Sequence, residues 1–309
     1  MKELNHRSFP APEGLIGERV DVAVSKLLGF SRTFASSLVE SGGVELDGKV
    51  ATKSDRVGSA SIISVSWMDK KQPEIVPVVI SGMSIKWDDP DIVIISKPPF
   101  LAAHPSLGWE GDTVLGALAG AGYRIATSGP PERQGIVHRL DVGTSGLMIV
   151  AKSEIAYSVM KDRFRDRKVK KEYHALVQGT PNPSSGTIDA PIGRHPGSAW
   201  KFAVTRDGRE SVTHYDTIAK HGPATLLSIG LETGRTHQIR VHMSANRHPL
   251  VGDVLYGADA KLATSIGLER QWLHAVRLTF EHPTTGETVD VTDDYATDLV
   301  NSLKLIDEL

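Results

Sequence analysis

The sequence of 309 residues contains no cysteine. This absence excludes disulfide bonds, cysteine-ligated zinc, iron–sulfur clusters and a thiol nucleophile. Long hydrophobic runs are also missing, since none approaches the roughly 18 residues that a membrane-spanning helix needs. The first 15 residues lack the apolar core of a signal peptide. We therefore expect a soluble cytoplasmic protein that has no membrane partner.

Several motifs that bind cofactors or nucleotides are missing as well. The sequence has neither the G-x-x-x-x-G-K-[ST] nor the G-x-G-x-x-G phosphate-binding pattern, and it has no G-x-S-x-G nucleophile elbow. Three histidines and an aspartate lie near one another, but their spacing matches no metal-ligand template (His237, His242, His248 and Asp253). We therefore expect neither a metal ion nor an organic cofactor.

Neither sign of charge dominates, because 35 Lys and Arg residues face 37 Asp and Glu residues. The net charge of −2 therefore argues for no particular partner. The distribution is uneven, since residues 161–171 (KDRFRDRKVKK) hold seven bases and two acids. Such a run is usually a solvated helix face, and it could equally contact phosphate groups. Both interpretations stay open at this point.

The first 70 residues predict a small unit of helices and short strands. Apolar residues at helical spacing mark residues 18–28, and Ser31 is a suitable N-cap for a second helix that ends at Gly42. Asp47-Gly48 is typical of a tight hairpin turn, and residues 62–67 alternate as a strand. Two prolines in residues 72–82 favour a linker.

Beyond residue 84 the pattern changes to many strands with few helices. The order of strands and helices is irregular, which favours an α+β fold with a largely antiparallel mixed sheet. Expected helices cover residues 112–120 with Asp112 as cap, 153–166 with Ser153 as cap, 236–246 and 295–306. Expected strands cover residues 91–97, 146–152, 172–179, 211–219, 225–232, 273–282 and 288–292.

The stretch GIVHRLDVGTSGLMIVAK (135–152) joins a polar turn to a buried strand. Side chains on a loop that a rigid strand anchors are common catalytic groups, and an aspartate beside an arginine keeps its negative charge. Asp141, which follows Arg139 by two residues, could therefore act as a nucleophile or base. An ordinary turn with a structural salt bridge explains the spacing equally well.

The same stretch closely resembles the signature of the RluA/RluD family of pseudouridine synthases, in which the Asp of HRLD is catalytic. Four more stretches resemble family elements in the family's order: KPPFLAAHP (97–105), KKEYHALVQG (170–179), LETGRTHQIRVHMSANRHPLVGDVLYG (231–257) and RQWLHAVRLTFEHPTTGE (270–287). Together they cover nearly all of residues 84–290. Phe100 and Arg247 each stand where the family usually has glycine, and neither departure touches Asp141.

The N-terminal region resembles the small RNA-binding module of the small-subunit ribosomal protein S-four. We expect this module at residues 14–75 and the pseudouridine synthase domain at residues 84–309. The combination resembles the large-subunit ribosomal RNA type of the family. Residues 1–75 hold ten bases and ten acids, so RNA binding there would depend on where Arg19, Arg32 and Lys49 point.

The resemblance implies isomerisation of uridine to pseudouridine within structured RNA, by base flipping and without a cofactor or metal. It makes Asp141 the catalytic carboxylate. We hypothesise that Arg235 pairs with Asp141 and that Tyr173 stacks on the flipped base and serves a late proton transfer. Arg139 would fill the gap left by the base. Further candidates for RNA contacts are His138, Lys97, Lys170 and Lys171.

Plainer roles remain open for these residues, namely phosphate binding by Arg235, core packing by Tyr173 and surface positions for Arg139 and the lysines. Two other functions also remain open. One is a hydrolase that uses Asp141 to excise a base, and the other is a non-catalytic RNA-binding protein of ribosome assembly. In each case RNA is the expected partner, with large-subunit ribosomal RNA favoured, and we expect a monomer.

Overall fold

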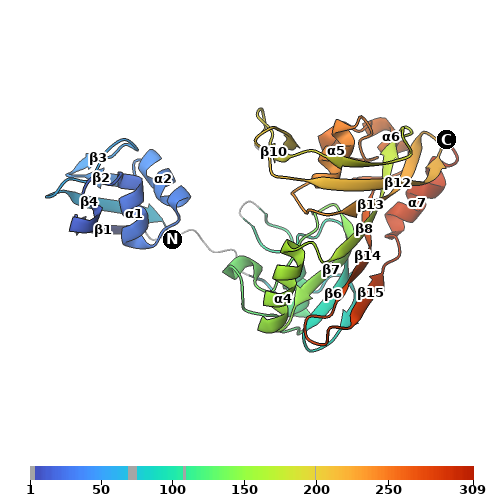
Figure 1. The fold of residues 1–309 in the computed structure, drawn as a ribbon, viewed down its shortest axis with the longest axis horizontal. Helices are drawn as coiled ribbons and strands as arrows, with labels where there is room; N and C mark the ends of the chain where they lie inside the picture. The colour runs from blue at the N-terminus through green and yellow to red at the C-terminus, as the bar shows by residue number, and fades with distance from the viewer. Residues whose placement is uncertain (1–3, 69–74, 107–108, 199) are drawn as a thin grey trace. The chain divides into compact units, whose positions relative to one another are not determined.

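The computed structural model describes residues 4–68, 75–106, 109–198 and 200–309. The chain divides into two compact units, Met1–Gln72 and Pro73–Leu309 (Figure 1). Within the described ranges, no helix combines the length and the hydrophobicity that crossing a membrane requires.

The N-terminal unit packs two helices on a four-stranded antiparallel sheet with the order β1-β4-β2-β3. Its elements are β1 (Leu4–Pro10), η1 (Glu13–Leu15), α1 (Val20–Leu28), α2 (Arg32–Glu40), β2 (Val44–Leu46), β3 (Lys49–Val50) and β4 (Ile62–Met68). The Ser31 hydroxyl caps α2 by accepting a hydrogen bond from the Phe34 N–H, as predicted. Asp47 and Gly48 both have positive φ, which the predicted hairpin turn requires.

Strand β1 is the element of this unit that the sequence analysis missed. It pairs along its whole length with β4 and lies before residue 14, where we expected the module to begin. Its side chains are mostly exposed, so the alternation of apolar and polar residues that identifies a half-buried strand is weak there.

The C-terminal unit, Pro73–Leu309, is built on a nine-stranded mixed sheet with the order β5-β6-β7-β14-β8-β13-β12-β9, and β15 pairs with β14. Its strands are β5 (Ser84–Asp88), β6 (Ile92–Lys97), β7 (Ser145–Ala151), β8 (Lys170–Gln178), β9 (Ser185–Asp189), β12 (Val212–His221), β13 (Ala224–Leu231), β14 (Leu273–Glu281) and β15 (Thr288–Thr292). A separate hairpin is formed by β10 (Ile192–Arg194) and β11 (Phe202–Val204). Among the pairings of the described strands, β7 with β14 is parallel and the others are antiparallel, which confirms the predicted α+β fold.

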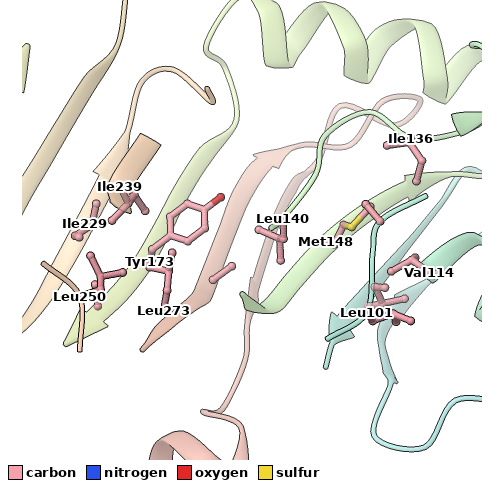
Figure 2. Close-up of a cluster of buried hydrophobic side chains, with 14 of the residues drawn as sticks. Leu101, Val114, Ile136, Leu140, Met148, Tyr173, Ile229, Ile239, Leu250 and Leu273 are labelled. Atoms are coloured by element: carbon pink, nitrogen blue, oxygen red, sulfur yellow. The ribbon is translucent and has the colours of Figure 1, made fainter. Parts of the chain in front are cut away.

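Helices cover both faces of this sheet, so its central strands are buried on both sides. The helical elements are α3 (Val114–Gly120), η2 (Pro131–Arg133), α4 (Glu154–Arg165), α5 (Gln238–Ala245), η3 (Val254–Tyr256), α6 (Ala260–Ser265) and α7 (Thr297–Ile306). On β6, Ile92 and Ile94 pack in the cluster that contains α4, whereas Val93 and Ile95 pack in the cluster that contains α3 and α5. The second cluster includes Tyr173 and is shown in Figure 2. This two-sided burial explains why β6 and β7 are continuous apolar runs in the sequence.

One predicted helix cap is wrong. Thr113, not Asp112, caps α3, because the Thr113 hydroxyl accepts the hydrogen bond from the Gly116 N–H at 3.0 Å. The two residues are adjacent and both have suitable side chains, so the sequence alone does not separate them.

A linker was predicted at residues 72–82, but the described part of this segment packs against the core. Residues 72–74 lie outside the described residues, while residues 75–80 are irregular and pack on α3. The Val78 N–H donates to the Gly116 carbonyl at 3.0 Å. A Cβ atom at Gly120 would lie 2.3 Å from the Val78 carbonyl oxygen, so glycine permits this close approach. This segment is therefore a packed part of the C-terminal unit.

Candidate active site

An open pocket lies beside the loop that precedes β7, and the empty space in it, including the part that is open to solvent, is about 530 Å³. Three more segments of the C-terminal unit contribute to its wall: β8, the chain from the end of β13 into α5, and the start of β14. Four of the predicted site residues line it, namely Asp141, Tyr173, Arg235 and Arg139.

Asp141 is the carboxylate that this pocket presents. Its side chain is 16% exposed, and its Oδ2 accepts a hydrogen bond from Arg240 Nη1 at 3.3 Å. His237 Nε2 lies 3.9 Å from the same oxygen. The carboxylate is thus accessible from the pocket while one side of it faces positive charge.

Arg240 is itself held in a fixed orientation. Its Nε and Nη2 donate to the two carboxylate oxygens of Asp253 at 2.7 and 2.9 Å, and its guanidinium lies 4.9 Å from the centre of the Tyr256 ring. This fork leaves Nη1 for Asp141, so one guanidinium joins two carboxylates. Burial lowers the pKa of Arg240, but the hydrogen bond and charge of Asp253, followed by the charge of Asp141, give a net rise.

The predicted ion pair between Arg235 and Asp141 is therefore wrong. Arg235 lines the pocket, but its Nε donates to the Glu210 carbonyl at 3.0 Å. The physical reason is the backbone between the two arginines, where His237 has a φ of 57° and α5 begins at Gln238. This sharp turn brings the first turn of α5, and with it Arg240, to the carboxylate. The spacing of His237 and Arg240 by three residues was the available signal, because such residues share a helix face.

Tyr173 lies on β8 and is 7% exposed. Burial, followed by the charge of Asp141, raises the pKa of its phenol, which therefore stays neutral at physiological pH. In Figure 2 the Tyr173 ring lies among Ile239, Leu273 and Leu140, and its hydroxyl points toward Leu140. A flat ring in the wall of the pocket is suited to stacking on a base.

Lys97, predicted to contact phosphate, is wrongly assigned. Its side chain is fully buried, and Nζ donates to the carbonyl oxygens of Pro98, Leu101 and Val142 at 2.9, 2.9 and 3.2 Å. Burial, reinforced by the nearby charge of Arg270, lowers its pKa to about 7. An ammonium group enclosed in this way cannot reach an RNA backbone, and it holds the loop that carries Asp141.

His138 also lies outside the pocket lining, contrary to its predicted role as an RNA contact. Its Nε2 accepts a hydrogen bond from the Ile149 N–H of β7 at 2.8 Å, and its ring stacks on Phe164 of α4. Withdrawal from water lowers its pKa to about 3, so the ring is neutral. Its contacts are those of a residue that supports the turn before β7.

The basic run at residues 161–171 crosses from α4 into β8. Its three arginines form ion pairs with acids, since Arg163 pairs with Glu281, Arg165 with Asp162 and Asp166, and Arg167 with Glu210 and Glu232. Lys168 and Lys170 are exposed. Lys171 is half-buried, and burial, with the charge of Arg167, lowers its pKa to about 8. The lysines of this run therefore remain the candidates for phosphate contacts.

In the N-terminal unit, two of the three predicted RNA contacts lie at the starts of the helices. Arg19 forms two hydrogen bonds with Asp21, at 2.9 and 3.0 Å, while its side chain stays 45% exposed. Arg32 is exposed in the first turn of α2, and Lys49 is exposed in β3. These positions leave all three side chains accessible to RNA.

Both units of the chain are similar to known proteins. The family model described as RNA pseudouridylate synthase matches residues 91–245, and the S4 domain matches residues 18–63. An uncharacterized RNA pseudouridine synthase of Mycobacterium bovis is 58% identical over 97% of this chain and 98% of its own. Ribosomal large subunit pseudouridine synthase D of Xanthomonas campestris is 36% identical over 98% of this chain and 93% of its own.

A solved structure agrees with these matches. Human RNA pseudouridylate synthase domain containing 1 superposes with a TM-score of 0.56 and 29% identity, over 72% of this chain and 88% of that chain. The predicted resemblances of both units are thereby confirmed. The chain belongs to the RNA pseudouridylate synthase family and is an isomerase that converts uridine in RNA to pseudouridine.

Proposed function

We propose that this protein forms pseudouridine in large-subunit ribosomal RNA and that Asp141 is its catalytic carboxylate. The observation that carries the proposal is the charged Asp141 in an open pocket, paired with the immobilised Arg240 and beside Tyr173. The RNA target is inferred from relatives named ribosomal large subunit pseudouridine synthase D.

The isomerisation needs no added reactant. The bond between the ribose C1′ and the base N1 breaks, the base turns over, and a bond from C1′ to C5 forms. The proton that leaves C5 balances the proton that N1 gains. Asp141 is the group placed to start this sequence, and the hydrogen bond from Arg240 orients its carboxylate.

A base within folded RNA has to leave its stack before it can enter such a pocket. Arg139 lines the pocket and is exposed, so its planar guanidinium can take the place of the extruded base. Tyr173 provides the ring on which the flipped uracil stacks inside. We further propose that the protein acts as a monomer.

The hairpin of β10 and β11 is a further candidate for an RNA-binding element. It forms a small sheet of its own (Figure 1). Phe202 contacts His237 of the pocket wall, with ring centres 5.7 Å apart. Trp200 is 83% exposed beside it. Residues 192–209 hold four bases and one acid (Arg194, Lys201, Arg206, Arg209 and Asp207). An exposed aromatic ring among basic residues suits an unstacked strand next to the flipped base.

The direct test is to incubate the purified protein with unmodified large-subunit ribosomal RNA and to map pseudouridines. We expect modification at a small number of defined uridines. Release of free uracil would instead indicate the base-excising hydrolase, and binding without any modification would indicate the non-catalytic RNA-binding protein. Modification of another RNA but not of this one would overturn the proposed target.

A further inference from the structure

The loop that follows Asp141 is held in place by hydrogen bonds to each of residues 142–145. The Val142 carbonyl accepts from the Phe100 N–H at 2.8 Å, and the Gly143 carbonyl accepts from Arg270 Nη1 at 2.9 Å. The Thr144 hydroxyl accepts from Gln271 Nε2 at 3.2 Å, and the Ser145 hydroxyl accepts from Arg270 Nη2 at 3.1 Å. Arg270 thus bonds two of the four residues after Asp141.

Arg270 has no freedom to leave this position. Its side chain is 1% exposed, and its other edge forms two hydrogen bonds with Asp298 in the first turn of α7, at 2.6 and 2.9 Å. A guanidinium with both edges bonded has its plane fixed. The backbone is equally confined, because a Cβ at Gly252 would lie 2.0 Å from the Arg270 carbonyl oxygen.

The Ser145 hydroxyl connects this arrangement to a second buried group. His274 Nδ1 lies 2.8 Å from the Ser145 oxygen, and His274 Nε2 lies 3.5 Å from a carboxylate oxygen of Asp293. The loop therefore rests on polar contacts from β14, from the residues just before β14 and from the segment that follows β6. Neither Arg270 nor Asp298 is among the residues that line the pocket, so any effect on the reaction must pass through the loop.

We propose that Arg270 is a positioning residue for Asp141 and that Asp298 of the C-terminal helix holds Arg270 in place. This inference rests on the proposed function of Asp141. Its physical basis is that small displacements of a reacting group lower the rate steeply, while binding of a large substrate depends on contacts elsewhere.

Strand β14, which begins three residues after Arg270, offers a matched control. Arg277 and Asp290 form the same kind of forked ion pair, with Arg277 Nε 2.7 Å from Asp290 Oδ1. Both residues are exposed, and their pair lies between β14 and β15 rather than against the loop. Changing this pair alters an arginine–aspartate fork on β14 without removing any of the bonds to the Asp141 loop.

The test compares R270K and D298N with R277K and D290N. Each full-length variant is assayed in single turnover with enzyme in excess over ribosomal RNA, at a temperature where it remains folded, and RNA affinity is measured separately. We expect R270K to lower the rate constant at least tenfold and D298N about threefold to tenfold, with RNA affinity within about twofold of wild type. Both control variants should keep the wild-type rate constant.

The remaining outcomes of this comparison are also decisive. The double variant R270K/D298N should be no slower than R270K, because Asp298 acts through Arg270. Wild-type rate constants in R270K and D298N would overturn the inference, and so would losses that R277K and D290N share. If R270K does not fold, D298N alone decides the question by the same rate constant. Failure of the wild-type protein to form pseudouridine would refute the proposed function and this inference with it, whereas a wild-type protein that forms pseudouridine while R270K and D298N keep its rate constant would refute this inference alone.

Discussion

At the scale of single residues, the site depends on how Arg240 divides its guanidinium between Asp141 and Asp253. A lysine would keep the charge but would lose the planar fork that binds both carboxylates. We expect R240K to lower the single-turnover rate constant about 100-fold. R235K should cost only a few-fold, because Arg235 bonds a backbone carbonyl rather than Asp141. Equal losses in the two variants would contradict this assignment.

His138 predicts a specific dependence of stability on pH. Its folded-state pKa of about 3 lies below the ordinary value of 6.5, so between these values the unfolded chain takes up a proton that the folded chain does not. The contribution of His138 to stability is therefore complete above pH 6.5 and is lost as pH falls toward 3.

The variant H138Q checks this directly, since glutamine retains an acceptor for the Ile149 N–H and does not titrate. We expect its free energy of unfolding in urea to fall less than that of wild type between about pH 7 and pH 5. Identical changes in the two proteins would show that His138 is not withdrawn from water.

At the scale of elements, the sequence predicted those whose signal is local. Ser31 and Ser153 cap the helices that they were expected to cap, and Asp47-Gly48 forms the expected turn. The missed elements are short or irregular in pattern: β1, β5, β9, β10, β11 and α6. Such segments are strands or helices because of the neighbours they pair with, and that information is not local to their residues.

The contact of α3 with residues 75–80 gives a prediction at this scale. In G120A the added methyl group would meet the Val78 carbonyl oxygen at 2.3 Å, so the backbone of the segment must move. We expect a loss of about 1–3 kcal/mol in the free energy of unfolding. G230A is the control, since its methyl group would meet only the His214 Cβ, at 3.9 Å, and should change stability by less than about 0.5 kcal/mol. A wild-type stability for G120A would show that the segment is only loosely attached.

At the scale of the whole molecule, chemistry and part of the RNA affinity are expected to reside in different units. Every residue of the Asp141 pocket belongs to the catalytic unit, while Arg32 and Lys49 are exposed in the N-terminal unit. The double variant R32E/K49E should weaken RNA binding and make it less sensitive to salt, because phosphate contacts release counterions. Its single-turnover rate constant at saturating enzyme should equal that of wild type.

The control for this variant is K304E, which reverses the charge of a lysine on α7 in the catalytic unit. It should leave both affinity and rate unchanged. An unaltered salt dependence in R32E/K49E would show that these two residues of the N-terminal unit do not contact phosphate groups.

Part of the candidate site was predictable from the sequence. Asp141, Arg139 and Tyr173 were identified from their stretches of sequence and do line one pocket. The supporting residues were not, because Arg240, Arg270 and Lys97 reach the Asp141 loop through tertiary contacts across 45 to 127 positions. Lys97 shows the limit most clearly, since a lysine expected on the surface is enclosed by three carbonyl groups.

The most direct test of the account is pseudouridine formation by D141N on large-subunit ribosomal RNA. Asparagine matches the shape of the side chain but removes the charge that Arg240 faces. The account predicts no detectable pseudouridine from D141N in single turnover, with RNA affinity within about threefold of wild type because phosphate contacts dominate binding. Pseudouridine formation by D141N at the wild-type rate would contradict it.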